Sequence, residues 1–183
     1  MAIFKFINKK YQTTTDLYNL INYVIENASS YYSPNMFHSS PDIMCAQFQY
    51  YKNYYYKIDG NQAIHFCLSI DSKKWEKDVT LQNFYKCGLD ICNIFRDYQT
   101  IMALHTDKKS HWDIHFVCNS VSFITGLKYH SSPTDFNYIM QEVAIYLSRY
   151  HMALQTINYY DENNKLRRGS ETSSFLYQNK DYF

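Results

Sequence analysis

The sequence predicts an α+β domain in which a single central antiparallel β-sheet is flanked by helices. Two observations support this fold class. Residues 100–105 and 112–120 are apolar, strand-forming segments separated by a short loop, and strands joined so closely can pair only antiparallel. The expected order of elements along the chain is βααβαββαβ, which places this hairpin among helices and further strands. Such an order is typical of one antiparallel sheet with helices packed against it.

The other elements follow from local patterns. The stripe from Leu17 to Val24, at i, i+3, i+4 and i+7 and preceded by three threonines that can act as N-caps, predicts an amphipathic helix facing a core. Residues 28–40 are rich in serine, tyrosine and asparagine and predict a loop. Further helices are expected at 41–56, 80–96 and 133–154, and further strands at 2–8, 63–70 and 156–160.

Composition limits the class of protein. The 183 residues are 46% hydrophobic and 19% charged, which predicts one globular domain. We expect this domain at residues 1–160, followed by a polar tail at 161–183 that is partly disordered. No segment approaches the about 20 uninterrupted apolar residues of a membrane span, so no membrane insertion is expected. Five cysteines without a Cys-x-x-Cys pair favour a reducing compartment, the cytoplasm.

Histidines and aspartates are concentrated in one stretch. His105 and Asp107 are followed by His111, Asp113 and His115, which are spaced by two. On a strand this spacing directs the last three side chains to one face, where imidazole and carboxylate groups can build a metal site. The expected hairpin would also bring His105 near Asp113 and His115. The alternative is an ordinary polar face on a half-exposed strand.

Three motifs resemble those of relaxases, the mobilisation nucleases of the HUH superfamily. The stretch from His105 to Asn119 resembles the family's third motif, which binds the metal. Residues 21–24, containing Tyr23, resemble the first motif, which carries a nucleophilic tyrosine. Residues 65–69, ending in Ser69, resemble the second motif, whose serine contacts DNA. The three motifs occur in the family's order and cover about residues 1–158.

The resemblance implies a ligand set and a nucleophile. Aligned on the final His-Phe-Val, the ligands are His105, Asp113 and His115, with Asp113 standing where the family has a histidine. Two imidazoles and one carboxylate suit Mn²⁺ or Mg²⁺. Two other readings stay open: His111 substitutes as a ligand, or the metal site has decayed. Tyr23 is the implied nucleophile, with Tyr18 on the same helix as its rival.

The implied reaction is a transesterification on single-stranded DNA at an origin of transfer, leaving a 5′-phosphotyrosine bond. Asp107 would orient His105, while Ser69, Lys108 and Lys109 would contact DNA. The tyrosines at 50–51 and 54–56 could stack on unpaired bases or simply line a helix surface. Accessory mobilisation proteins and a coupling protein are the implied partners in a bacterial cytoplasm.

Other functions compatible with the sequence are a rolling-circle replication initiator, a non-catalytic DNA-binding module derived from a nuclease, and an unrelated metal-dependent hydrolase. The near-neutral net charge of +1 and Asp113 would permit the non-catalytic module. The tyrosine precedes the histidine motif, which favours the relaxase over the replication initiator.

Overall fold

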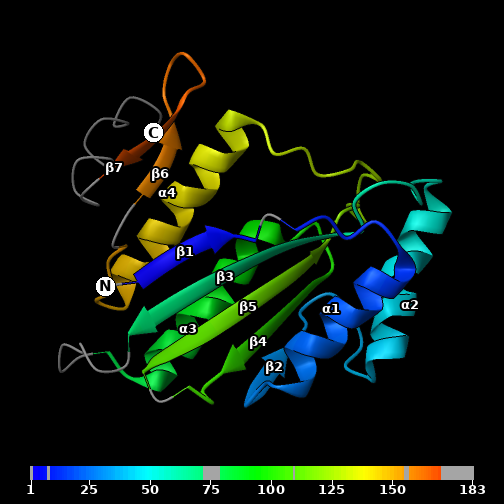
Figure 1. Ribbon diagram of the computed structural model, residues 1–183, viewed down its shortest axis with the longest axis horizontal. Helices are drawn as coiled ribbons and strands as arrows, with labels where there is room; N and C mark the ends of the chain where they lie inside the picture. The colour runs from blue at the N-terminus through cyan, green and yellow to red at the C-terminus, as the bar shows by residue number, and fades with distance from the viewer. Residues whose placement is uncertain (1, 8, 72–78, 109, 155–156, 170–183) are drawn as a thin grey trace.

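Five strands form one antiparallel sheet in the order β1-β3-β5-β4-β2 (Figure 1). The computed structural model describes residues 2–7, 9–71, 79–108, 110–154 and 157–169. The strands are β1 (Ala2–Phe6), β2 (Ser30–Tyr32), β3 (Ala63–Asp71), β4 (Thr100–His105) and β5 (His111–Asn119). The predicted fold class and the predicted β4–β5 hairpin are confirmed.

Four helices pack on the two faces of this sheet: α1 (Thr14–Glu26), α2 (Pro41–Tyr54), α3 (Leu81–Cys92, continued by the 3₁₀ turn η1, Asn93–Phe95) and α4 (Pro133–Arg149). Their starts follow the local sequence. Thr13 and Asp16 form a capping box on α1, and Ser132 and Asp135 form another on α4. Pro41 occupies the first turn of α2, where its missing N–H has no cost.

The period of two along each strand separates two cores. One face carries Phe66, Met102 and Phe116 among others, and it packs against α3 and α4. The opposite face carries Ala63, Ala103 and Val117, and it packs against the apolar sides of α1 and α2. The second core occupies only part of its face, because the polar side chains of the predicted motifs project from the same side of the strands.

Three elements differ from the sequence prediction. β2 lies inside the expected loop and joins the sheet through backbone pairing with β4, which its polar sequence did not signal. α4 ends at Arg149 rather than near 154, because His151 takes a left-handed conformation with φ of 57°. The expected boundary at residue 160 falls inside a hairpin of β6 (Ile157–Tyr160) and β7 (Leu166–Gly169), next to α4 in Figure 1.

The rest of the expected tail, residues 170–183, lies outside the described residues. Among the helices of the described ranges, none combines the length and the apolar character needed to cross a membrane.

Candidate functional site

Three neighbouring strands place polar side chains in two adjoining rows on the face that α1 covers. In the first row, Asp113 of β5 lies between Ser69 of β3 and His105 of β4. In the second row, His115 of β5 lies opposite Cys67 of β3. Asp113 and His115 are two residues apart on one strand and therefore share a face. The strand register thus brings together the three residues implied as metal ligands.

The two histidine rings of this group lie next to each other, with their centroids 4.6 Å apart. Nε2 of His105 is 2.8 Å from the carbonyl oxygen of Val24 in α1. Because a carbonyl can only accept, this nitrogen carries the proton, and the Nδ1 of a neutral His105 ring keeps its lone pair. In a metal-binding histidine, one ring nitrogen usually donates a hydrogen bond, and the lone pair of the other nitrogen binds the metal.

His115 is oriented by a chain of hydrogen bonds below the site. Its Nδ1 is 3.0 Å from Nε2 of His65, and Nδ1 of His65 is 2.8 Å from the hydroxyl of Tyr11. If Nδ1 of His115 donates to His65, then His65 donates in turn to Tyr11, and Nε2 of His115 keeps its lone pair. His65 and Tyr11 are both buried, so their polar groups bond to each other and to His115 rather than to bulk water.

Burial also keeps these rings neutral. Burial, reinforced by the neighbouring His105, lowers the pKa of His115 to about 4. Burial and then the proximity of His115 lower the pKa of His65 to about 3. Burial raises the pKa of the Tyr11 hydroxyl to about 12. Near neutral pH, the two imidazoles are therefore uncharged and available as ligands or hydrogen-bond acceptors.

Tyr23 lies over both imidazoles. Its ring centroid is 6.1 Å from that of His105 and 5.8 Å from that of His115, edge-on in both cases. The buried residues Ile21 and Val24 anchor α1 on the sheet, and Tyr23, on the flank of this stripe, stays 49% exposed. At 3.6 residues per turn, the helical period puts residue 23 on the flank of the stripe that runs from Leu17 to Val24. A half-exposed phenol next to two imidazole rings is accessible to a large substrate.

Tyr18, the rival on the same helix, is placed differently. It is partly buried and packs against the apolar cluster between α1 and α2. Five residues separate it from Tyr23, which turns the two side chains about 140° apart around the helix. Tyr18 therefore belongs to the packing of the helices, whereas Tyr23 faces the histidines.

Asp113 is buried and engaged through both carboxylate oxygens. Oδ1 accepts a hydrogen bond of 2.5 Å from the Ser69 hydroxyl, and Oδ2 accepts one of 3.2 Å from Nζ of Lys108. Nε2 of His111 lies 3.4 Å from the same Oδ2. Burial alone would raise the pKa of Asp113, but the hydrogen bonds from Ser69 and Lys108 outweigh it and hold the pKa below its ordinary value of 3.8. The carboxylate is therefore ionised.

The remaining predicted residues lie at the rim. His111 begins β5 and is partly exposed, with Nδ1 3.0 Å from the hydroxyl of Ser110. Asp107 is exposed, and the Val24 carbonyl, not Asp107, accepts from Nε2 of His105. The prediction that Asp107 orients His105 is therefore not supported at this nitrogen. Lys109 lies outside the described residues.

The donor set fits Mn²⁺ or Mg²⁺ in kind, since it combines two imidazoles and an ionised carboxylate. As the side chains stand, the described residues contain no group of three His, Cys, Asp or Glu side chains arranged to hold a metal ion. Asp113 is turned toward Ser69 and the Lys108 ammonium. Lys108 is half exposed, so it can leave Asp113 without disturbing the core.

Sequence reasoning gave no role to His65 and Tyr11. His65 could have been suspected, because it shares a strand face with Ser69. Tyr11 gave no signal, because it lies in a loop and meets His65 only through the fold, 54 residues apart.

Two comparisons bear on this site. The sequence profile described as "Relaxase: MobA/VirD2-like, nuclease domain" matches residues 18–167. The fold is similar to a crystal structure of the MobM relaxase domain (MOBV; Mob_Pre), bound to Mn and to origin-of-transfer DNA of plasmid pMV158. That similarity has a TM-score of 0.59 at 12% sequence identity and covers 97% of this chain and 98% of MobM. No curated protein sequence matches the chain.

Proposed function

Because the chain belongs to the MobA/VirD2-like relaxase family and is a DNA-nicking nuclease, we propose that it cuts one DNA strand at an origin of transfer through Tyr23. The observation that supports Tyr23 is its position, half exposed above the paired rings of His105 and His115. Of the two tyrosines of α1, Tyr23 is the one that combines solvent access with ring contacts to both histidines, whereas Tyr18 packs between the helices. The substrate would be single-stranded at the nick.

The proposed reaction is a transesterification. The Tyr23 oxygen attacks the scissile phosphorus, an O–P bond forms to tyrosine, and the bond from phosphorus to the 3′-oxygen breaks. Tyr23 loses one proton and the leaving 3′-oxygen gains one, so no net proton is consumed. The phosphodiester energy is kept in the 5′-phosphotyrosine, which allows the strand to be rejoined after transfer.

Mn²⁺ or Mg²⁺ is the proposed cofactor, with His105, Asp113 and His115 as the residues that would hold it. When bound, such an ion polarises a phosphate oxygen and neutralises charge at the reacting group. The chain's own residues prepare this step: Val24 and His65 orient the two rings, and Ser69 holds Asp113. The Mn in the MobM crystal supports a divalent ion without selecting Mn²⁺ over Mg²⁺.

Lys108, once released from Asp113, and Lys109 are proposed to bind backbone phosphates, and Ser69 to contact DNA next to the scissile group. The origin-of-transfer DNA in the MobM complex supports this class of substrate. We further propose that the nuclease acts in the bacterial cytoplasm with accessory mobilisation proteins and a coupling protein. The domain expected at residues 1–160 is proposed to extend to Gly169, because β6 and β7 pair across residue 160.

The test for Tyr23 is a covalent adduct. Wild-type protein incubated with Mn²⁺ and single-stranded DNA carrying its origin of transfer should form a protein–DNA species that survives denaturing electrophoresis. Tyr23→Phe removes only the attacking oxygen and should abolish the adduct while leaving the unfolding free energy within about 0.5 kcal/mol. Tyr18→Phe, on the same helix, is the matched control and should keep the adduct.

The other outcomes separate the alternative functions. Cleavage without an adduct would indicate a hydrolase that uses water, and binding without cleavage would indicate a non-catalytic DNA-binding module. An adduct that survives in Tyr23→Phe but disappears in Tyr18→Phe would overturn the choice of nucleophile.

The ligand set has its own test. Asp113→Ala should abolish Mn²⁺-dependent nicking, because it removes the charged ligand from the centre of the site. His111→Ala should only weaken nicking, because His111 lies at the rim and contacts Asp113 from outside. The reverse ranking would show that His111, rather than Asp113, is the third ligand.

A further inference from the structure

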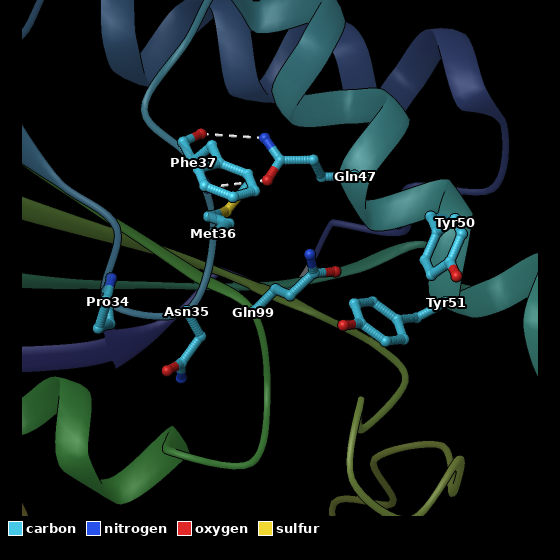
Figure 2. A pocket seen from close by; sticks show the side chains of 8 residues that line it. All are labelled: Pro34, Asn35, Met36, Phe37, Gln47, Tyr50, Tyr51 and Gln99. Atoms are coloured by element: carbon cyan, nitrogen blue, oxygen red, sulfur yellow. Dashed lines mark hydrogen bonds between the residues drawn. The ribbon is translucent and has the colours of Figure 1, made fainter.

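A second candidate site lies at the other end of β4 from His105. It is a cavity of about 480 Å³ between α2 and the segment that follows β2. Its wall includes the aromatic rings of Phe37, Tyr50 and Tyr51 and the amide side chains of Asn35, Gln47 and Gln99 (Figure 2). Neither the metal site nor the nucleophile of the proposed reaction uses these residues.

Phe37 is held in place although its ring is in solvent. Its side chain is 83% exposed. Its backbone is bound twice by the Gln47 amide, whose Oε1 accepts from the Phe37 N–H at 2.8 Å and whose Nε2 donates to the Phe37 carbonyl at 2.9 Å. Both bonds are visible in Figure 2. A large apolar ring on a fixed backbone is preorganised for contact with a partner.

Further rings continue from the cavity along α2. Tyr50 and Tyr54, one helical turn apart, are 62% and 64% exposed. Their planes are nearly parallel, at 16°, with centroids 6.4 Å apart. Phe37 and Tyr50 both line the cavity, and we call the three exposed rings of Phe37, Tyr50 and Tyr54 the aromatic row. Aromatic faces are the surfaces on which proteins stack successive unpaired bases, and side-chain amides hydrogen-bond base edges.

A positive charge accompanies the cavity. Asn35 donates through Nδ2 to the carbonyl of Arg96 at 2.9 Å, which ties the cavity wall to Arg96. The Arg96 side chain is 83% exposed, and its only described ion pair is a long one of 3.9 Å to the exposed Asp97. Arg96 is thus bound to the cavity wall through its backbone, and its solvated guanidinium is available to bind a phosphate of a nucleic-acid strand.

The cavity and the nuclease site lie at opposite ends of β4, next to the edge strand β2. β2 begins opposite the end of β4, where Ser30 pairs with Leu104 beside His105, and the chain that leaves β2 enters the cavity wall at Pro34. Gln99, at the other end of the cavity wall, directly precedes β4. The six residues of β4 span about 20 Å. This is about six nucleotides at the rise of a stacked strand, and fewer in an extended one.

We propose that this cavity and the aromatic row bind unpaired bases of the single-stranded DNA that flanks the nick, within about six nucleotides of it. The proposal rests on the proposed function, since it assumes that the strand is held at Tyr23. It adds a second DNA-binding subsite, away from the reacting phosphate, at which flanking bases contribute to the affinity for DNA.

The test is equilibrium binding with a metal chelator present, so that no cleavage occurs. Fluorescence anisotropy would compare a short oligothymidine of about 4 nucleotides with a long one of about 20, bracketing the usual site sizes. Phe37→Ala and Tyr50→Ala should each weaken binding of the long oligonucleotide about fivefold or more, the usual effect of losing one stacked base. Binding of the short one should change less than twofold.

The matched control is Tyr138→Ala, which removes a comparably exposed tyrosine from α4 on the opposite face of the sheet. It should bind both oligonucleotides like the wild type. Because Phe37 and Tyr50 are exposed, their replacement should leave thermal unfolding unchanged, so lost affinity cannot be ascribed to lost fold. Gln47→Leu removes the two hydrogen bonds to the Phe37 backbone but keeps the Phe37 ring. It should weaken binding of the long oligonucleotide by a smaller factor than Phe37→Ala.

Equal affinities of wild type, Phe37→Ala and Tyr50→Ala for the long oligonucleotide would overturn the proposal and leave the aromatic row to a protein partner. Equal losses for short and long oligonucleotides would also overturn it, because the cavity would then not be a remote subsite. These outcomes are independent of adduct formation. If no adduct forms but Phe37→Ala still weakens binding of the long oligonucleotide, the proposed nucleophile is refuted and the proposed cavity is not.

Discussion

The two faces of the central sheet are built from the same strands and differ in what they bury. The face against α3 and α4 buries rings and aliphatic side chains, with Phe66 stacked on Phe116 at a centroid distance of 4.7 Å. The face against α1 and α2 buries every lysine, histidine and aspartate that is buried among the described residues: Lys52, His65, His105, Asp113 and His115. One face therefore stabilises the fold by apolar packing, and the other carries the polar side chains of the candidate site.

This division has a physical cause. Burial of a charge or an imidazole needs compensating hydrogen bonds, and the strand register supplies them between neighbouring strands, as between Ser69 and Asp113. Apolar burial on the opposite face provides the free energy that offsets the cost. Mutations on the apolar face should therefore affect mainly stability, and mutations on the opposite face mainly metal binding and catalysis.

The largest effect on stability is expected on the apolar face. Phe66→Ala should lower the free energy of unfolding by about 3–5 kcal/mol, because the ring is fully buried and stacks on Phe116. Urea denaturation measures this loss. Cys67→Ala, the next residue of β3 and on the site face, is the matched control and should cost about 1 kcal/mol. Equal losses at the two positions would contradict the division between the faces.

An effect of intermediate size is expected from Lys52, whose Nζ is buried in the α2 layer and donates to the Gln62 carbonyl at 2.6 Å. Burial lowers its pKa from 10.5 to about 7. Between these values the unfolded chain binds a proton that the folded chain does not, so stability rises with pH. This contribution is complete above pH 10.5 and is lost as the pH falls to about 7.

Urea denaturation should therefore show the wild type gaining about 2–3 kcal/mol from this residue between pH 7 and 9. Lys52→Met should remove that gain and raise stability at pH 7, since it buries no charge. Lys57→Met, which replaces an exposed lysine just after α2, should keep the wild-type pH dependence. An unchanged pH dependence in Lys52→Met would show that Lys52 is not the group responsible.

The smallest effect concerns His65, which touches no substrate in the proposed reaction and orients His115 instead. His65→Phe removes the acceptor facing Nδ1 of His115 and should lower Mn²⁺ affinity about 10- to 100-fold by calorimetry. His65→Gln retains an acceptor and should recover part of that loss. His130→Ala, at an exposed histidine, should bind Mn²⁺ like the wild type. Equal Mn²⁺ affinities of His65→Phe and the wild type would show that His65 contributes only to packing and does not orient His115.

Much of the fold and part of the site could be predicted from the sequence. The period of two along β5 directed Asp113 and His115 to one face, and the short loop before β5 required the antiparallel hairpin that adds His105. The stripe of α1 set Tyr23 on the helix flank, where it is half exposed. These features depend on neighbouring residues in the chain, so a local pattern is enough to reveal them.

Contacts between distant segments were decided by the tertiary structure alone. No local pattern indicated that the Val24 carbonyl would orient His105, that Tyr11 would support His65, or that β2 would join the sheet edge. Nor did the sequence indicate that Gln47 would hold Phe37 beside a cavity. The physical reason is that a hydrogen bond or a cavity wall depends on which surfaces pack together, whereas periodicity specifies only which side of an element is apolar.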